Sequence, residues 1–293
     1  MKRTFLHRVL RVFVKEQNLK WIPDGLYLRF RYFVLMKKVL RLRKPVTFNE
    51  KLQWLKLHDR RPIYTTMVDK CEAKKFVAER IGEQYIIKTL GVWNTFDEID
   101  FDQLPNQFVL KCTHDSGGLV IVNDKSKLDI EQARNKIEKC LKINYFWNGR
   151  EWPYKNVKPR IIAEDYIAVE GEDLRDYKFF CFNGKVECFK IDFDRFIEHR
   201  ANYYTPQGEM LPFGEAVCPP DFDRNIEMPS NLDLMIELAK KLSVDTSFVR
   251  VDFYNVRGNI YFGELTFFPG SGAGPFIPSI WDEKLGDLLQ LPK

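Results

Sequence analysis

The segment 249–276 constrains the fold of this 293-residue chain more than any other stretch. Two strand-like runs, Phe248–Tyr254 and Asn259–Thr266, flank a turn that contains Arg257 and Gly258. Runs of this length joined by a glycine-containing turn predict a β-hairpin. A glycine-rich stretch, Pro-Gly-Ser-Gly-Ala-Gly, follows the second run directly. The sequence therefore predicts an antiparallel strand pair that leads into a glycine-rich loop.

Charged side chains gather on one face of this expected hairpin. Because side chains alternate between the two faces of a strand, Arg250 and Asp252 share one face, as do Glu264 and Thr266. Clustered carboxylates suit Mg²⁺, which binds through one or two carboxylates plus substrate phosphates, and Arg250 can hold a phosphate or a carboxylate bidentately. A cross-strand salt-bridge ladder also explains the charges, but it does not explain the glycine-rich loop. The pattern predicts a nucleotide-phosphate site.

A second candidate site lies at residues 108–122, where a strand, a loop and another strand follow one another. The strand delivers Lys111, and the loop contains Ser116, Gly117 and Gly118. Glycines let backbone amides approach a phosphate closely, and a lysine supplies positive charge. This stretch predicts a phosphate-binding loop, with an ordinary hairpin and a surface lysine as the alternative.

Two more expected strands carry charged residues. The apolar run 161–167 contains Glu164 and Asp165, where a carboxylate can meet ribose hydroxyls while backbone groups meet an adenine edge. In residues 173–186, Asp176 and Lys178 share a strand face and can pair at an active site. The alternatives are a strand that ends at a charged turn and an ion pair at the surface.

Composition narrows the class of protein. Hydrophobic residues make up 45% and aromatic residues 14% of the chain, which is typical of a globular protein. No apolar run approaches the length that spans a bilayer, and the first residues lack the apolar core of a signal peptide. Six cysteines without a CxxC pair and four histidines without an HxxxH pair predict reduced, buried thiols rather than a structural zinc site. We expect a cytoplasmic enzyme of two or three subdomains.

Charge is distributed unevenly along the chain. Residues 1–61 contain 17 Lys and Arg against four Asp and Glu, whereas the remainder contains 29 basic and 37 acidic residues. Apolar residues at helical spacing in the basic part suit an anionic membrane surface, which residues 1–44 would contact. The alternative is a helical arm whose apolar stripe packs on the body of the protein. Nucleic acid is not an expected partner, because no recognised binding module accompanies the basic residues.

Local signals predict helices and strands in an order typical of an α+β protein. Thr47 with Glu50, and Asp69 with Glu72, have the spacing of helix N-terminal caps. Further helices are expected at 130–143 and 232–242. Strands are expected at 85–92, 108–112, 119–123, 160–167, 176–183 and 185–192, and in the hairpin. Strand pairs interleaved with helices favour α+β layering over repeated βαβ units.

Six stretches stand in a recognisable order: Phe-Asn-Glu-Lys-Leu-Gln-Trp-Leu-Lys (48–56), Val-Asp-Lys (68–70), Leu-Lys-Cys-Thr-His-Asp-Ser-Gly-Gly (110–118), Ile-Ala-Glu-Asp-Tyr-Ile (162–167), Arg-Asp-Tyr-Lys-Phe-Phe (175–180) and Val-Arg-Val-Asp-Phe-Tyr (249–254). This order resembles the ATP-grasp superfamily and, more closely, the TupA-like ATP-grasp proteins of bacterial surface-polysaccharide clusters. The resemblance implies an ATP-grasp fold, with ATP held between two α+β subdomains after a basic helical arm. We expect an arm at 1–61, an α/β portion at 62–100, the small subdomain at 101–190 and the large subdomain with the Mg²⁺ site at 191–293.

The resemblance further implies an ATP-dependent carboxylate–amine ligase. ATP would phosphorylate a carboxylate to an acyl phosphate, and an amine would displace phosphate to form an amide. The resemblance implies that Lys70, Lys111 and Lys178 bind ATP phosphates beneath a covering loop at Ser116, Gly117 and Gly118. Contact with ribose or adenine is implied for Glu164, Asp165 and Ile167. Ligation of Mg²⁺ is implied for Asp252, Glu264 and Thr266, and stabilisation of the transferring phosphoryl group for Arg250. Lys178 and Arg250 would be the catalytic pair.

One position departs from the family pattern. Many ATP-grasp ligases have asparagine where this chain has Thr266. Threonine offers a hydroxyl oxygen on a shorter side chain, so a second Mg²⁺ would need both oxygens of Glu264.

The resemblance suggests that the substrates are a uronic acid of a surface glycan or its lipid-linked precursor and an amino acid or other amine. Arg200, Tyr203, Tyr204 and the segment Trp147–Lys155 are candidates for an acceptor surface, with a structural loop as the alternative for that segment. A glycosyltransferase is the main rival, supported by Asp192-Phe-Asp194, a triplet that can bind the metal of a nucleotide sugar. A non-catalytic nucleotide- or glycan-binding protein is a third possibility.

Overall fold

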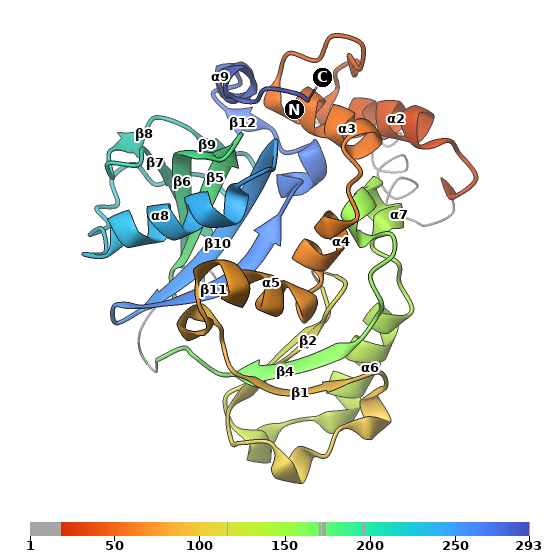
Figure 1. Cartoon of the computed structure of the whole chain (residues 1–293), viewed down its shortest axis with the longest axis vertical. Helices are drawn as coiled ribbons and strands as arrows, with labels where there is room; N and C mark the ends of the chain where they lie inside the picture. Colours follow the sequence, from red (N-terminus) through yellow and green to blue (C-terminus); the bar gives the residue numbers. More distant parts are fainter. Residues whose placement is uncertain (1–18, 116, 170, 172–173, 195–196, 293) are drawn as a thin grey trace.

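The computed structural model describes residues 19–115, 117–169, 171, 174–194 and 197–292. These residues form two main antiparallel sheets with helices packed around them (Figure 1). The predicted α+β class is confirmed. The helices are α2 (Asp24–Met36), α3 (Phe48–His58), α4 (Ile63–Val68), α5 (Glu72–Ile81), α6 (Ile130–Leu141), α7 (Phe146–Gly149), α8 (Leu232–Ser243) and α9 (Ile280–Leu288).

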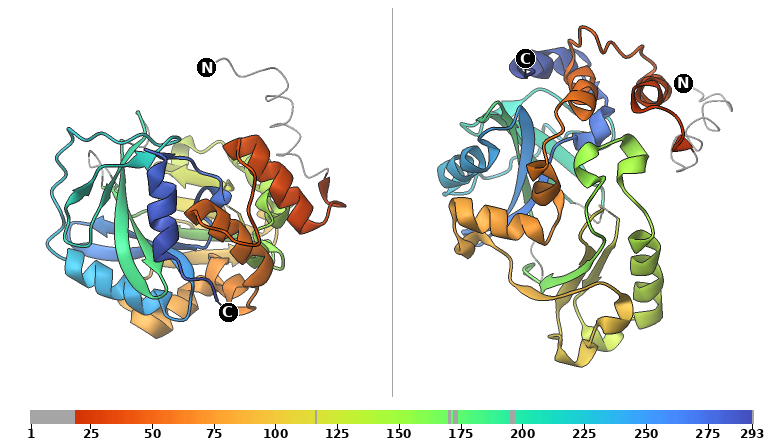
Figure 2. Two further views of the ribbon diagram at one scale, coloured as in Figure 1. Left: turned by 90° about the horizontal axis from the view of Figure 1, so that it is seen from above. Right: turned by 45° about the vertical axis from the view of Figure 1, so that its right-hand side comes forward.

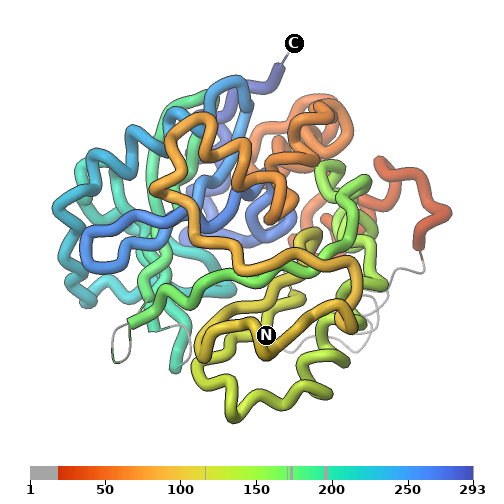
Figure 3. Tube along the Cα trace, turned by 60° about the horizontal axis from the view of Figure 1, so that its bottom comes forward, coloured from red at the N-terminus to blue at the C-terminus, as the bar shows by residue number. Residues whose placement is uncertain are grey.

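The smaller sheet has four strands, in the spatial order β1 (Thr89–Trp93), β4 (Ile161–Asp165), β2 (Phe108–Cys112) and β3 (Leu119–Val122). Helix α6 packs against β2 and β3 and buries Ala133 and Ile137 there, next to Phe108 and Leu110. This apolar contact forms a separate core for the smaller sheet. Figure 3 shows β1 alongside β4, although β1 begins at Thr89 and β4 only at Ile161.

The larger sheet has six strands, in the order β11 (Asn259–Thr266), β10 (Phe248–Val256), β5 (Asp176–Phe182), β6 (Lys185–Phe193), β7 (Arg200–Tyr204) and β8 (Met210–Leu211). Beside it, β12 (Phe276–Ile277) pairs with β9 (Gly214–Glu215). The hairpin predicted from the first motif is therefore confirmed as β10 and β11, at one edge of the sheet.

Helix α8 covers one face of the larger sheet, so alternate residues of each strand either face the helix or point away from it (Figure 1). The Cys181 thiol reaches the backbone oxygen of Ala239 in α8, so β5 turns Cys181 toward the helix. Val249 lies opposite Cys181 and Val251 opposite Phe179, and all of these side chains are fully buried. Because strand side chains alternate, Arg250 and Asp252 lie on the opposite face, away from α8.

The sheets divide the chain at a different place from the expected subdomain boundaries. The expected boundary at 190 falls inside β6, which pairs with β5 on one side and β7 on the other. The smaller sheet instead ends at Asp165 and the larger sheet begins at Asp176, while β1, expected before the small subdomain, belongs to the smaller sheet. The Asn183-Gly184 turn marks a hairpin correctly, but it carries no information about which sheet that hairpin joins.

One expected strand begins later than predicted. Residues 83–85 form a 3-10 turn after Gly82, and β1 starts only at Thr89. Gly82 has a φ of 113°, a conformation that side chains rarely adopt, so it ends α5 and redirects the chain into this turn.

The basic N-terminal part is seen from α2 onward. Residues 1–18, which contain the predicted amphipathic spacing at 5–13, lie outside the described residues. Helix α2 buries Tyr27, Leu28 and Tyr32 against the body of the protein, which supports the docked-arm alternative for this helix. Figure 2 shows α2 and α3 at the same end of the molecule as α9. Among the described residues, no helix combines the length and apolar character needed to cross a membrane.

The N-terminus of α3 is fixed by the capping box that the sequence predicts. The Thr47 hydroxyl accepts a hydrogen bond from Glu50 N at 3.3 Å, and a Glu50 carboxylate oxygen accepts from Thr47 N at 3.2 Å. Glu50 also pairs with Arg41 at 2.7 Å. The cap sets the start of a helix that, as described below, supports the glycine-rich loop.

We expect Thr47→Ala to lower the free energy of unfolding by about 1 kcal/mol, because a buried backbone donor loses its cap. Urea denaturation followed by circular dichroism measures this change. Thr66→Ala in α4, for which the cap argument does not apply, is the matched control. An equal effect of the two substitutions would contradict the role of the cap.

Candidate active site

The polar face of the larger sheet carries a row of side chains that lie directly opposite one another across five strands. Glu264, Asp252, Lys178, Lys190 and Tyr203 are consecutive cross-strand partners from β11 to β7. Their side chains share one face because register and alternation both hold along the row. Strand pairing thus collects residues that are up to 86 positions apart, counting from 178 to 264.

Arg250 joins the residues of the predicted metal site. Its Nε and Nη2 atoms donate to Asp252 Oδ1 and Oδ2 at 2.7 and 2.6 Å. The same Nη2 atom donates to Glu264 Oε1 at 3.0 Å and to Thr266 Oγ1 at 3.1 Å. The Thr266 hydroxyl also donates to Glu264 Oε1 at 3.0 Å. The predicted convergence of these four residues is confirmed.

The two carboxylates of this group sit in different electrostatic surroundings. Burial raises the pKa of Asp252, although Arg250 and Lys178 act against it. Burial acts in the same direction on Glu264, but Arg250 and Lys70 outweigh it and lower its pKa to about 2. The Glu264 side chain is 42% exposed, whereas Asp252 is 3% exposed. Glu264 is therefore an ionised carboxylate that solvent can reach.

The charge network continues across β5 and β6. Lys178 pairs with Asp176, with Asp252 at 3.2 Å and with Asp192 at 3.5 Å. These carboxylates raise the pKa of Lys178 despite its burial. Lys190 then pairs with Asp192 and with Glu215, both at 3.4 Å. The predicted pairing of Asp176 with Lys178 is confirmed, and it belongs to a buried network rather than to the surface.

Lysines surround Glu164 on the smaller sheet. Lys111 and Lys74 each lie 2.5 Å from one oxygen of this carboxylate. Burial would raise the pKa of Glu164, but the two ammonium groups more than offset it and the pKa is lowered. Burial lowers the pKa of Lys74, against the attraction of Glu164. Asp165 and Ile167 follow Glu164 where the chain leaves β4, and both are half-buried.

The predicted loop at 116–118 is tied to the start of α5. Lys70 Nζ donates to the backbone oxygen of Asp115, and Lys70 N donates to Thr113 O at 3.0 Å. Ser116 lies outside the described residues. A Cβ atom on Gly118 would lie 2.5 Å from the Cys112 sulfur, so packing alone requires glycine there. Gly117 has no comparably close neighbour.

The glycine-rich loop after β11 is held from α3. Lys56 is fully buried and donates to Gly149 O at 2.8 Å and to Ser271 O at 2.9 Å. Gln53 donates to Gly272 O at 2.5 Å, and a Cβ atom on Gly272 would lie only 2.4 Å from the Gln53 amide nitrogen. Burial lowers the pKa of Lys56 to about 7. Helix α3 thus fixes the shape of a loop more than 200 residues away in the chain.

Known proteins provide an independent comparison. A family model described as TupA-like ATPgrasp matches residues 50–290. The chain belongs to the TupA-like ATP-grasp family. The family predicted from the six stretches is therefore confirmed. No curated protein matches the chain.

Solved structures of other ATP-grasp proteins are similar at low identity. D-alanine–D-alanine ligase from Bacillus anthracis with ATP matches at 16% identity over 76% of this chain and 63% of that chain, with a TM-score of 0.44. The ATP-grasp ligase PsnB with a precursor variant, Mg and ADP matches at 12% over 85% and 63%, with a TM-score of 0.42. Phosphoribosylamine–glycine ligase from Thermotoga maritima matches at 16% over 72% and 50%, with a TM-score of 0.39. The chain spans less than two thirds of each of these proteins.

The acceptor surface predicted on this TupA-like ATP-grasp protein is wrong for Tyr203 and Tyr204. Tyr203 and Tyr204 are buried, and the Tyr203 ring stacks on Phe213 with centroids 4.2 Å apart. Both faces of β7 are covered, so neither ring is available to stack on a sugar. In the segment Trp147–Lys155, Arg150 is buried and lies 3.1 Å from Asp24, so the structural-loop alternative holds there.

Several polar residues of the site were not assigned from the sequence. Each of these residues contacts a segment that is distant in the chain. They are Gln53, Lys56, Lys74, Lys190 and Glu215. The only sequence signal was charge at alternate positions of β6, at Lys190 and Asp192, between the apolar residues Phe189, Ile191 and Phe193. The others sit on helices or at strand ends, where a charged residue usually faces water.

We expect Lys56→Met to lower the free energy of unfolding by about 1–3 kcal/mol, because buried backbone oxygens of Gly149 and Ser271 lose their donor. Chemical denaturation at pH 6 measures the change. Lys75→Met, at an exposed position of α5, is the control and should change stability by less than about 0.5 kcal/mol. Equal stability of the Lys56 variant and the parent protein would show that the loop does not need this contact.

Proposed function

We propose that the protein is an ATP-dependent carboxylate–amine ligase that forms an amide through an acyl phosphate. The observation that carries the proposal is Arg250 bridging Asp252 and Glu264 across paired strands, in a chain of the TupA-like ATP-grasp family. Such a group stabilises charge in phosphoryl transfer, where catalysis is mainly positioning and electrostatic neutralisation.

The lysine side of the site supports binding of ATP. Lys74 and Lys111 outnumber their shared carboxylate, Glu164, by one positive charge, and Lys70 interacts with Lys111, which suits an anionic triphosphate. We assign the phosphates to Lys70 and Lys111, with residues 116–118 as the covering loop. We assign contact with the ribose and adenine to Glu164, Asp165 and Ile167. Glu164 would contact the ribose while Lys74 and Lys111 neutralise its charge.

The opposite side fits Mg²⁺. Eight charged residues on the polar face, Arg250, Lys178, Lys190, Asp176, Asp192, Glu215, Asp252 and Glu264, carry three positive and five negative formal charges. This excess of negative charge favours a cation at the polar face. Asp252, Glu264 and the Thr266 hydroxyl offer the oxygen ligands that Mg²⁺ prefers. When bound, Mg²⁺ neutralises charge on the phosphates.

In the proposed reaction, a substrate carboxylate oxygen bonds to the γ-phosphorus as the bond to ADP breaks, giving an acyl phosphate. A neutral amine then bonds to the carbonyl carbon, phosphate leaves, and the amine nitrogen loses one proton. Arg250 and Lys178 hold negative charge on the transferring group. Both side chains are already fixed by carboxylates, so little reorganisation accompanies the reaction.

For substrates, we propose a uronic acid of a bacterial surface polysaccharide or its precursor, together with an amino acid or other amine. This choice rests on the resemblance to TupA-like proteins. The reaction would take place in the cytoplasm, where ATP and lipid-linked precursors are both accessible.

Hydroxylamine with ATP and Mg²⁺ provides the decisive assay, because an acyl phosphate yields a hydroxamate that is identified by mass. We expect Asp252→Asn and Glu264→Gln each to reduce hydroxamate formation by about 100-fold or more. Asp233→Asn and Glu237→Gln, at exposed positions of α8, are matched controls that should retain activity. Full activity in both site variants, with ATP consumed, would overturn the assignment.

The assay also separates the alternatives. A glycosyltransferase would consume a nucleotide sugar and form no hydroxamate. A non-catalytic binding protein would retain nucleotide affinity without turnover of either substrate.

We also propose that the basic N-terminal part contacts an anionic membrane. Leu26, Phe30 and Phe33 follow one another at helical spacing on the exposed side of α2, and Arg29 and Lys37 share that side. An apolar stripe with basic residues suits the interface of an anionic bilayer. Residues 1–18, the remaining part of the predicted contact, lie outside the described residues.

We expect Phe33→Ser to reduce co-sedimentation of the full chain with phosphatidylserine-containing vesicles by about tenfold, because a buried phenyl ring contributes about 1.5–3 kcal/mol. Phe222→Ser is the matched control, since Phe222 is 51% exposed and Phe33 52% exposed. Equal binding by the two variants, or no binding by the parent protein, would exclude α2 as the membrane contact.

A further inference from the structure

Three side chains of types that bind metals come from separate segments and converge near Lys190. Asp192 lies near the end of β6, His199 immediately precedes β7, and Cys218 follows β9. A carboxylate oxygen, an imidazole nitrogen and the thiol sulfur of these residues all lie within 4.8 Å of one another. None of them belongs to the predicted Mg²⁺ site.

The spacing of the ligand atoms suits a shared ion. Asp192 Oδ2 lies 3.5 Å from His199 Nε2, which is longer than an ordinary hydrogen bond between nitrogen and oxygen. In a tetrahedral zinc site with bonds of about 2.0–2.3 Å, neighbouring ligand atoms are about 3.3–3.7 Å apart. The pair already has the separation that coordination requires, and the sulfur needs a shift of about 1 Å at most.

The donor set selects the class of metal. A thiolate, an imidazole and a carboxylate together suit a borderline ion such as Zn²⁺, whereas Mg²⁺ takes oxygen ligands. We propose that Asp192, His199 and Cys218 bind one Zn²⁺ ion, with water in the fourth position. The three ligands differ from the proposed Mg²⁺ ligands, although Asp192 also contacts Lys178 of the proposed ligase site.

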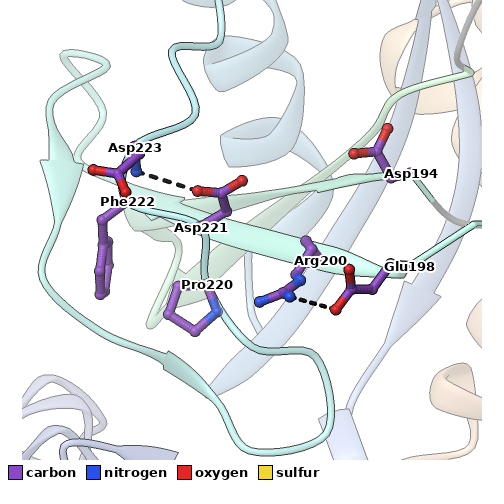
Figure 4. A pocket seen from close by; sticks show the side chains of 7 residues that line it. All are labelled: Asp194, Glu198, Arg200, Pro220, Asp221, Phe222 and Asp223. Carbon is purple, nitrogen blue, oxygen red and sulfur yellow. Dashed lines mark hydrogen bonds and ion pairs between the residues drawn. The ribbon is translucent and has the colours of Figure 1, made fainter.

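A cavity lies on the other face of β6 and β7, where Arg200 is paired with Phe193, the neighbour of Asp192. The same three segments continue into its walls, and its volume is about 540 Å³ (Figure 4). Its lining residues are Asp194, Glu198, Arg200, Pro220, Asp221, Phe222 and Asp223. Four carboxylates against one guanidinium give a negative potential that draws cations toward the cavity. The His199 side chain is 39% exposed, so an ion can reach it from solvent.

Two lysines lie beside the carboxylate of Asp192. Lys190 lies 3.4 Å from Asp192 Oδ1, and Lys178 lies 3.5 Å from Asp192 Oδ2. A carboxylate has about four lone-pair sites, so Asp192 can bind a metal while it keeps Lys190 as an outer partner, an arrangement common around metal ligands.

The test uses the full chain after removal of metals with a chelator. Zinc is added in competition with a chromogenic chelator, and Co²⁺ is added separately. We expect one equivalent of Zn²⁺ per chain, and a thiolate-to-cobalt charge-transfer band in the near-ultraviolet spectrum. Cys218→Ser and His199→Gln should each weaken zinc binding by more than about tenfold, since loss of an outer partner alone costs about 10–100-fold.

Cys71→Ser and His58→Gln are the matched controls and should leave zinc binding unchanged. Circular dichroism verifies that each variant is folded, and half-exposed His199 tolerates substitution if the buried Cys218 does not. Absence of zinc binding by the parent protein would overturn the proposal. So would a cobalt complex without the thiolate band, or binding that persists in folded His199→Gln.

Discussion

The polar face of the larger sheet depends on the Arg250 guanidinium. It contacts Asp252 on its own strand and both Glu264 and Thr266 on the neighbouring strand. Removing one partner of a buried ion pair costs about 3–5 kcal/mol, because the other charge stays buried and unpaired. Asp252 is in that position, since burial already raises its pKa. Arg250 therefore makes it possible to hold two carboxylates side by side.

Buried ion pairs of this kind add little net stability, because desolvation offsets their attraction. Apolar burial stabilises both faces of the larger sheet. Val249, Val251 and Phe253 join the main core on the face toward α8, and Phe180 and Phe248 join it on the face that carries Arg250. The two faces therefore differ in composition. The face toward α8 is apolar, whereas the other face combines fixed charges with aromatic rings that pack on Phe48 of α3.

The two groups of charged side chains, one around Glu164 and one on the larger sheet, carry excess charge of opposite sign. Lysines exceed carboxylates around Glu164, whereas carboxylates exceed cations along the row from Glu264 to Glu215. A nucleotide–metal complex has the complementary arrangement, with anionic phosphates and a cation at one end. Helix α3 also fixes the conformation of the glycine-rich loop, because Lys56 and Gln53 donate hydrogen bonds to its backbone oxygens. The amino-terminal and carboxy-terminal parts of the chain are therefore interdependent.

The sequence by itself determined what depends on neighbouring residues. Period-two alternation placed Arg250 and Asp252 on one face, the Thr47–Glu50 spacing gave the cap of α3, and six ordered stretches gave the family. Tertiary structure decided everything that depends on strand order. Only pairing with β10 puts β5 and β6 in the larger sheet, beyond the expected boundary, and only covering of both faces of β7 buries Tyr203. The physical reason is that local spacing fixes which face a side chain occupies, while long-range packing fixes what lies opposite that face.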